Sequence, residues 1–113
     1  MEKNLLDRFR ADPRLRVLQV VPTDDFQVYV YFSDGTIHLV DMKPTIATGT
    51  VFKPLQDPEF FKIRCTVMLG TLAWDISGDY DETRCVDLAP EWVYAFPEVP
   101  DPLESDVKYE LAS

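Results

Sequence analysis

The corner Ser33-Asp34-Gly35-Thr36 constrains the fold of this chain more than any other feature of the sequence. It separates two runs of β-branched and aromatic residues, 26–32 and 36–41, which is the pattern of two strands. Asp-Gly between two such runs is the strongest short signal for a β-hairpin, because a type I′ turn needs a positive φ at both central residues. The sequence therefore predicts an antiparallel hairpin that is closed by a two-residue loop at Asp34 and Gly35.

The loop length sets which side chains of the hairpin share a face. A two-residue loop pairs Phe32 with Ile37, and successive side chains of a strand alternate between the two faces. The face expected to point into the core carries Val28, Val30, Phe32, Ile37 and Leu39. The opposite face then carries Tyr29, Tyr31, His38 and Val40, and it is less polar than a solvated face. We predict that this second face is either covered by another element or used to bind a protein partner.

The rest of the chain predicts short elements joined by turns. Further runs of strand-forming residues lie at 16–21, 65–69, 71–75 and 85–88. Residues 4–10 are expected to form a short amphipathic helix or a loose N-terminal arm. Short helices are also expected at 43–48, after Asp57-Pro58 and at 90–94, since Asp57 suits an N-cap and Pro58 a first helical position. The predicted fold class is α+β, a small antiparallel sheet begun by an N-terminal β-hairpin, with one or two short helices packed on it and an extended C-terminal tail.

Length and composition predict a single domain followed by a tail. The chain has 113 residues, which is the size of one domain. After Phe96 the composition changes, because Pro97, Pro100 and Pro102 lie among acidic residues and proline disrupts regular sheet pairing. We therefore predict one α+β domain over residues 1–96 and a Pro-rich acidic tail over residues 97–113.

The charge of the chain restricts its partners. Twenty acidic residues against 11 basic ones give a net charge of −9. Such a body repels phosphate backbones, which argues against direct nucleic-acid binding and favours basic partners. The alternative is that the acidic charge only keeps the domain soluble. No segment approaches the roughly 20 apolar residues that span a bilayer, so we expect no membrane contact and a cytoplasmic protein with Cys65 and Cys85 reduced.

The sequence offers no constellation that points to catalysis, a cofactor or a metal. His38 is the only histidine, and a general base needs an orienting partner. Cys65 and Cys85 are not spaced as a C-x-x-C pair, and the acids of 75–82 lack the spacing of a calcium loop. We therefore predict a protein that is not an enzyme, with no cofactor.

A small-molecule pocket is the alternative to protein binding. Ligand pockets are mostly apolar and hold a few polar groups, a composition that this chain permits. The aromatic residues that are candidates for lining such a pocket are Phe52, Phe61, Trp74 and Trp92.

Several short motifs, in order, resemble a bacterial family known as domain of unknown function 2442. They are residues 28–35 with Val40-Asp41, then Leu72-Ala73-Trp74, and then 87–90 leading to Val93-Tyr94. The resemblance covers residues 16–96 and implies a compact α+β domain built on an N-terminal hairpin, without implying an activity. Genes of that family often lie beside a second family, domain of unknown function 4160, in pairs that look like toxin–antitoxin modules.

Some members of that family carry a helix-turn-helix domain after this one, and the Pro-rich segment 97–113 does not match that version. Our leading hypothesis is a non-enzymatic interaction module. Its partner is expected to be a small basic, toxin-like protein for which this chain is the antitoxin-like half, and self-association as a homodimer is a close variant.

Overall fold

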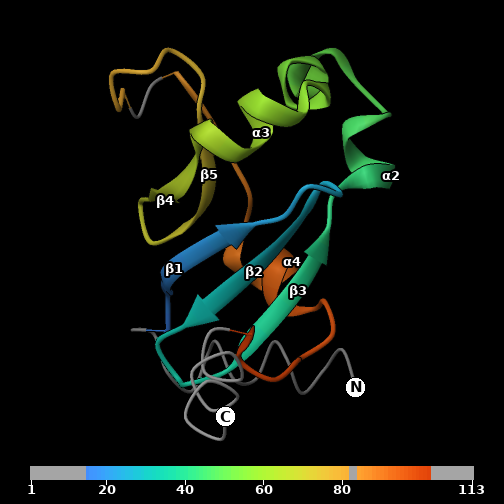
Figure 1. The fold of residues 1–113 in the computed structure, drawn as a ribbon. Coiled ribbons are helices and arrows are strands. Elements are labelled where there is room, and N and C mark those ends of the chain that lie inside the picture. The colour runs from blue at the N-terminus through green and yellow to red at the C-terminus, as the bar shows by residue number, and fades with distance from the viewer. Residues whose placement is uncertain (1–14, 82–83, 103–113) are drawn as a thin grey trace, which may run out of the picture.

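The computed structural model describes residues 15–81 and 84–102, which form two antiparallel sheets (Figure 1). The first is three-stranded, with the order β1 (Val17–Pro22), β2 (Gln27–Phe32), β3 (Ile37–Asp41). The second is also three-stranded, with the order β4 (Cys65–Met68), β5 (Thr71–Asp75), β6 (Cys85–Asp87). The predicted α+β class is confirmed, and each predicted strand forms, although the strands divide between two sheets.

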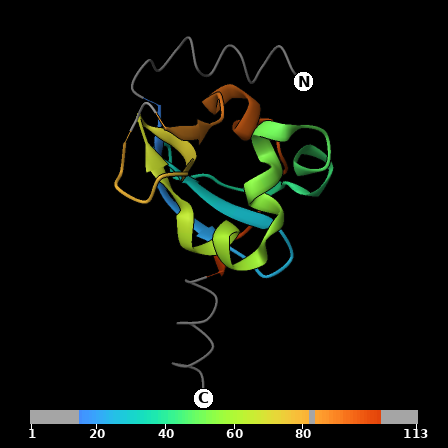
Figure 2. The same ribbon diagram turned by 90° about the horizontal axis from the view of Figure 1, so that it is seen from above.

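Short helices connect and cover the sheets. They are α2 (Lys43–Ile46), the 3-10 helix η1 (Thr50–Gln56), α3 (Pro58–Arg64) and α4 (Pro90–Tyr94). The predicted cap of α3 is confirmed, because the Asp57 carboxylate accepts a 3.0 Å hydrogen bond from the Glu59 amide. Seen from above, α3 and η1 lie over one end of the first sheet, and α4 lies on one side of it (Figure 2). The helix predicted at 4–10 lies outside the described residues.

The hairpin loop is one residue longer than predicted. The Phe32 amide donates to the Thr36 carbonyl at 2.9 Å, and the Gly35 amide donates to the Phe32 carbonyl at 3.1 Å. Gly35 has a φ of 87°, in the left-handed region. A turn followed by one left-handed residue is the usual form of a three-residue hairpin loop, and the Asp34 carboxylate fixes it by accepting from the Thr36 amide at 3.0 Å.

This extra loop residue corrects the predicted pairing by one position. Val30 pairs with His38, and Tyr31 pairs with Ile37. A slip of one residue turns every side chain of a strand to the other face, so the prediction was right for β2 and wrong for β3. The hairpin side chains that are buried in the core are Val28, Val30, Phe32, His38 and Val40. The half-buried side chains of the opposite face are Tyr29, Tyr31, Ile37 and Leu39.

One hydrophobic core joins both sheets, α3 and α4. At its centre the rings of Phe61 and Trp74 lie 5.2 Å apart, and the Trp74 indole donates to the Phe61 carbonyl at 2.9 Å. Ile63 of α3 points away from this core and is 73% exposed. The two sheets are also tied directly, because the Val17 amide donates to the Gly70 carbonyl at 2.9 Å.

The segment after α4 returns along β3. The Leu39 amide donates to the Pro97 carbonyl at 3.0 Å, and the Val99 amide donates to the Ile37 carbonyl at 2.8 Å. Glu98 forms an isolated antiparallel bridge with His38. The first residues of the predicted tail therefore lie against the free edge of the first sheet, and residues 103–113 lie outside the described part of the chain.

Candidate functional site

The most apolar accessible surface of the first sheet is the face that points away from the core. We define the outer face as Tyr29, Tyr31, Ile37 and Leu39. All of these side chains are half-buried, and β1 adds Val21 opposite Tyr29. Among the described residues, α4 covers the other side of the sheet and no helix lies over the outer face (Figure 1).

An irregularity in β1 extends apolar character beyond the outer face. The pairing of β1 with β2 shifts between Val17 and Gln19, as it does at a β-bulge. Val17 is buried, whereas Leu18 beside it is 57% exposed. The bulge therefore leaves a large apolar side chain accessible on the strand next to β2.

A carboxylate from the C-terminal segment reaches one tyrosine of the outer face. The Tyr31 hydroxyl donates a 2.7 Å hydrogen bond to the Asp101 carboxylate, across 70 residues of sequence. Tyrosine suits such a place because its ring is apolar and its hydroxyl is polar. The contact puts negative charge at the end of the outer face that lies next to the hairpin loop.

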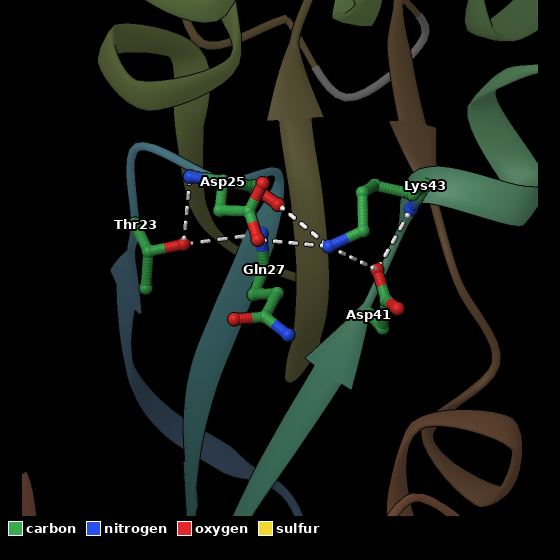
Figure 3. A network of polar contacts seen from close by, with 5 residues as sticks. All are labelled: Thr23, Asp25, Gln27, Asp41 and Lys43. Atoms are coloured by element: carbon green, nitrogen blue, oxygen red, sulfur yellow. Dashed lines mark hydrogen bonds and ion pairs between the residues drawn. The ribbon is translucent and has the colours of Figure 1, made fainter.

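A network of charged residues lies at the other end of the first sheet, where the turn between β1 and β2 meets the end of β3 (Figure 3). The Lys43 ammonium lies 2.9 Å from the Asp25 carboxylate and 3.7 Å from that of Asp41. The hydrogen bond to Asp25 raises the pKa of Lys43. The Thr23 hydroxyl accepts from the amides of Asp25 and Gln27, each at 3.2 Å, and so holds the turn that carries Asp25.

A further ion pair joins the same turn to α3. The Lys62 ammonium donates to the Asp24 carboxylate, and this hydrogen bond lowers the pKa of Asp24. Three carboxylates (Asp24, Asp25, Asp41) therefore face two ammonium groups (Lys43, Lys62) at this end, which stays net negative.

His38 does not belong to the outer face. Its side chain is 3% exposed, its ring centroid lies 4.4 Å from that of Tyr94, and its Nδ1 lies 2.7 Å from the Phe96 carbonyl oxygen. A carbonyl oxygen only accepts, so Nδ1 carries the hydrogen. His38 is a structural residue that fastens the hairpin to the end of α4.

Of the predicted partner-binding residues, the structure keeps only two together. Tyr29 and Tyr31 lie on the outer face, whereas the predicted position of His38 and Val40 on that face was wrong, because both are buried. The sequence reasoning missed Ile37 and Leu39. The signal was Gly35, which fits the last position of a three-residue loop as well as a two-residue one.

The predicted aromatic pocket residues are dispersed in the structure. Phe61 and Trp74 are fully buried against each other, and Phe52 is half-buried at the edge of the core. Trp92 is 39% exposed and packs on Phe96, with 4.9 Å between ring centroids. Two cavities in the described part of the chain, of about 420 and 250 Å³, are lined by none of these four residues.

Comparison with known families agrees with the resemblance seen in the sequence. The model of a family described as protein of unknown function (DUF2442) matches residues 17–96. The chain belongs to this family. The DUF2442 match spans both sheets and all of the outer face, and it ends at Phe96, the residue whose carbonyl binds His38. A search of the curated proteins and a search of the solved structures found no match.

Both cysteines of this DUF2442 chain lie on the second sheet. Cys65 lies on β4 and Cys85 on β6, with β5 between them. Burial raises the pKa of the Cys65 thiol to about 12, so the thiol stays protonated at neutral pH, and a protonated thiol is a poor nucleophile.

Within residues 15–81 and 84–102, no group of three or more His, Cys, Asp or Glu side chains is arranged to hold a metal ion. In the same ranges, no helix has the length and apolar character needed to cross a membrane.

Proposed function

We propose that this DUF2442 chain is a non-enzymatic interaction module that binds a basic protein through its outer face. The observation that carries the proposal is the apolar cluster of Tyr29, Tyr31, Ile37 and Leu39 on a sheet side that no described helix covers. Protein interfaces combine an apolar, tyrosine-rich centre with a polar rim. The outer face has this composition.

Charge supports a basic partner. Asp101 lies at one end of the outer face, and the carboxylates of Asp24, Asp25 and Asp41 lie at the other. The chain as a whole carries −9. Complementary charge around an apolar centre speeds association and disfavours partners of like charge.

The same charge argues against the homodimer variant, because two copies at −9 repel each other. In the gene context that the family resemblance implies, the partner would be a small, basic, toxin-like protein, and this chain would be its antitoxin-like half. We propose the cytoplasm as the place where the two meet.

Photo-crosslinking in the native host tests the proposal. The crosslinking amino acid p-benzoylphenylalanine replaces Tyr29 on the outer face in one variant, and in the control it replaces Trp92, the partly exposed aromatic residue of α4. We expect one discrete adduct from position 29, absent from position 92, that contains a protein of net positive charge and weakens as salt rises. Equal adducts from both positions, an adduct with an acidic protein, or no discrete adduct at position 29 would refute the proposal.

A further inference from the structure

A cavity of about 420 Å³ lies on the second sheet, away from the outer face. Arg64 and Thr66 line it from the end of α3 and from β4, and Asp75, Gly78 and Tyr80 line it from the end of β5 and the loop that follows. Cys65 pairs with Trp74, and Thr66 pairs with Ala73. Side chains alternate along a strand, so Thr66 lies on the face opposite to Cys65, which packs on the core.

The loop over this cavity is fixed by its own hydrogen bonds. The Asp75 carboxylate accepts from the Gly78 amide at 3.1 Å and from the Tyr80 amide at 2.9 Å. The Tyr80 hydroxyl then donates to the Val67 carbonyl at 2.6 Å, which ties the loop back to β4. The cavity wall is thus formed before any ligand arrives.

Two contacts orient the Arg64 guanidinium within this wall. One of its N–H groups donates to the Asp75 carbonyl at 3.2 Å, and its Cζ lies 5.4 Å from the centre of the Phe60 ring. It also packs against Gly78, where an added Cβ would lie 2.8 Å from Arg64 Cζ. A side chain at position 78 would therefore push the guanidinium out of this position.

Two side chains at the cavity, Arg64 and Thr66, keep hydrogen-bond donors that the described residues do not use. A guanidinium has five N–H groups, and Asp75 accepts one of them, so the others have no hydrogen-bond partner among the described residues. The Thr66 hydroxyl, which also lines the cavity, has no partner within the same residues. A guanidinium with N–H groups left to donate matches the planar geometry of a carboxylate.

We propose that this cavity binds a small monocarboxylate, with Arg64 and Thr66 donating to its oxygens. Cavities of 300–1,000 Å³ are typical of small-molecule sites, and this one lies within that range. Ile63 and Tyr80, which are 73% and 55% exposed, provide apolar surface at the cavity for the carbon part of the ligand. This inference is independent of the proposed protein partner, which binds the other sheet.

Charge favours a monoanion over a phosphate. The Asp75 carboxylate lines the cavity, and Asp79 and Asp81 lie in the adjoining loop. Repulsion grows with the charge of the ligand, so a doubly charged phosphate is rejected more strongly than a carboxylate. For a carboxylate the repulsion is smallest, and the N–H groups of Arg64 can offset it by donating to both carboxylate oxygens.

The test is an amide NMR titration of the full chain with sodium benzoate, at constant ionic strength, compared with the neutral isostere benzamide. We expect benzoate to shift the amides of residues 64–66 and 75–80, and benzamide to bind at least about tenfold more weakly, because charge-assisted hydrogen bonds are lost. Inorganic phosphate is the third ligand, and we expect it to bind more weakly than benzoate.

Variants separate the site from general electrostatics. Arg64→Gln should weaken benzoate binding by about tenfold or more, and Thr66→Val by about threefold. Arg84→Gln is the matched control, because it removes one positive charge near the same sheet. Arg84 is exposed, and its guanidinium lies 3.9 Å from the Asp81 carboxylate. The affinity of this variant for benzoate should stay within about twofold of the wild-type affinity.

Several outcomes would overturn the proposal. They are the absence of benzoate-induced shifts, equal affinity for benzoate and benzamide, tighter binding of phosphate than of benzoate, or equal losses in Arg64→Gln and Arg84→Gln. If Arg64→Gln does not fold, the benzamide comparison and Thr66→Val still decide the question, because neither alters the guanidinium that packs against the loop.

Discussion

The Nδ1 of His38 lies 2.7 Å from the carbonyl oxygen of Phe96, a residue 58 positions further along the chain. The histidine is the second residue of β3, and Phe96 follows α4. The contact therefore closes the DUF2442 domain by joining its first sheet to the end of its last described helix. It also shows that the single histidine is used for folding, because its ring lies in the core.

Replacing His38 should destabilise the protein. His38→Phe keeps an aromatic ring in contact with Tyr94 and removes both ring nitrogens, which leaves the Phe96 carbonyl without this donor. We expect a loss of about 1–3 kcal/mol in the free energy of unfolding, the usual cost of an unpaired buried polar group. Urea denaturation measures it, with Trp92→Phe as the control that alters a partly exposed ring. An unchanged midpoint for His38→Phe would contradict the assigned role.

The hairpin loop predicts a graded response at Gly35. Its φ is 87°, and an added Cβ would meet no atom within 4 Å, so any cost of substitution arises from the backbone conformation alone. Gly35→Ala should lower the free energy of unfolding by about 1 kcal/mol, and Gly35→Asn should cost less, because asparagine tolerates the left-handed region. Equal stability of the two variants in urea would argue against a left-handed residue at this position.

The observed register predicts opposite results at two neighbouring positions. Leu39 is half-buried on the outer face, whereas Val40 is fully buried. Leu39→Glu should fold and lose about 1 kcal/mol or less, whereas Val40→Glu should lose about 3 kcal/mol or more, since it buries an unpaired charge. Circular dichroism and urea denaturation compare the two. Greater damage from Leu39→Glu would support the two-residue loop instead.

Burial of Cys65 should lower the free energy of unfolding as the pH rises above 9. Its pKa rises from 9.0 to about 12 in the folded chain, because burial disfavours the thiolate. Above pH 9 the unfolded state releases this proton while the folded state keeps it, so stability is full below pH 9 and falls as the pH rises towards 12. Between pH 8 and pH 10 the wild type should lose about 1 kcal/mol more than Cys65→Ala. Parallel pH profiles of the two proteins would show that the thiol is accessible.

Local signals in the sequence predicted most elements of the fold. Asp57 and Pro58 marked the start of α3, because a helix cap depends only on neighbouring residues. The side chains of β2 were assigned to the correct faces, because their alternation along the strand is also a local property. The face of β3 was wrong, because Asp-Gly fits loops of two lengths and the choice between them turns the whole strand.

The parts of the candidate sites that sequence reasoning missed depend on distant contacts. The hydrogen bond from Tyr31 to Asp101 spans 70 residues, and no periodicity connects the two. Arg64 becomes a candidate ligand-binding residue only because the loop carrying Gly78 folds against it. Nothing in the local pattern distinguishes Arg64 from a charged residue that simply ends a helix.

The most direct test of the proposed function is photo-crosslinking from position 29 in the background of Leu39→Glu. The control background is Val51→Glu, which places the same charge at a residue that is 61% exposed in η1. If the outer face binds a basic partner, the adduct should fall to about a tenth or less in Leu39→Glu and persist in Val51→Glu, because a charge at the apolar centre of an interface costs most of its affinity. A folded Leu39→Glu variant that still forms the full adduct would contradict the proposal.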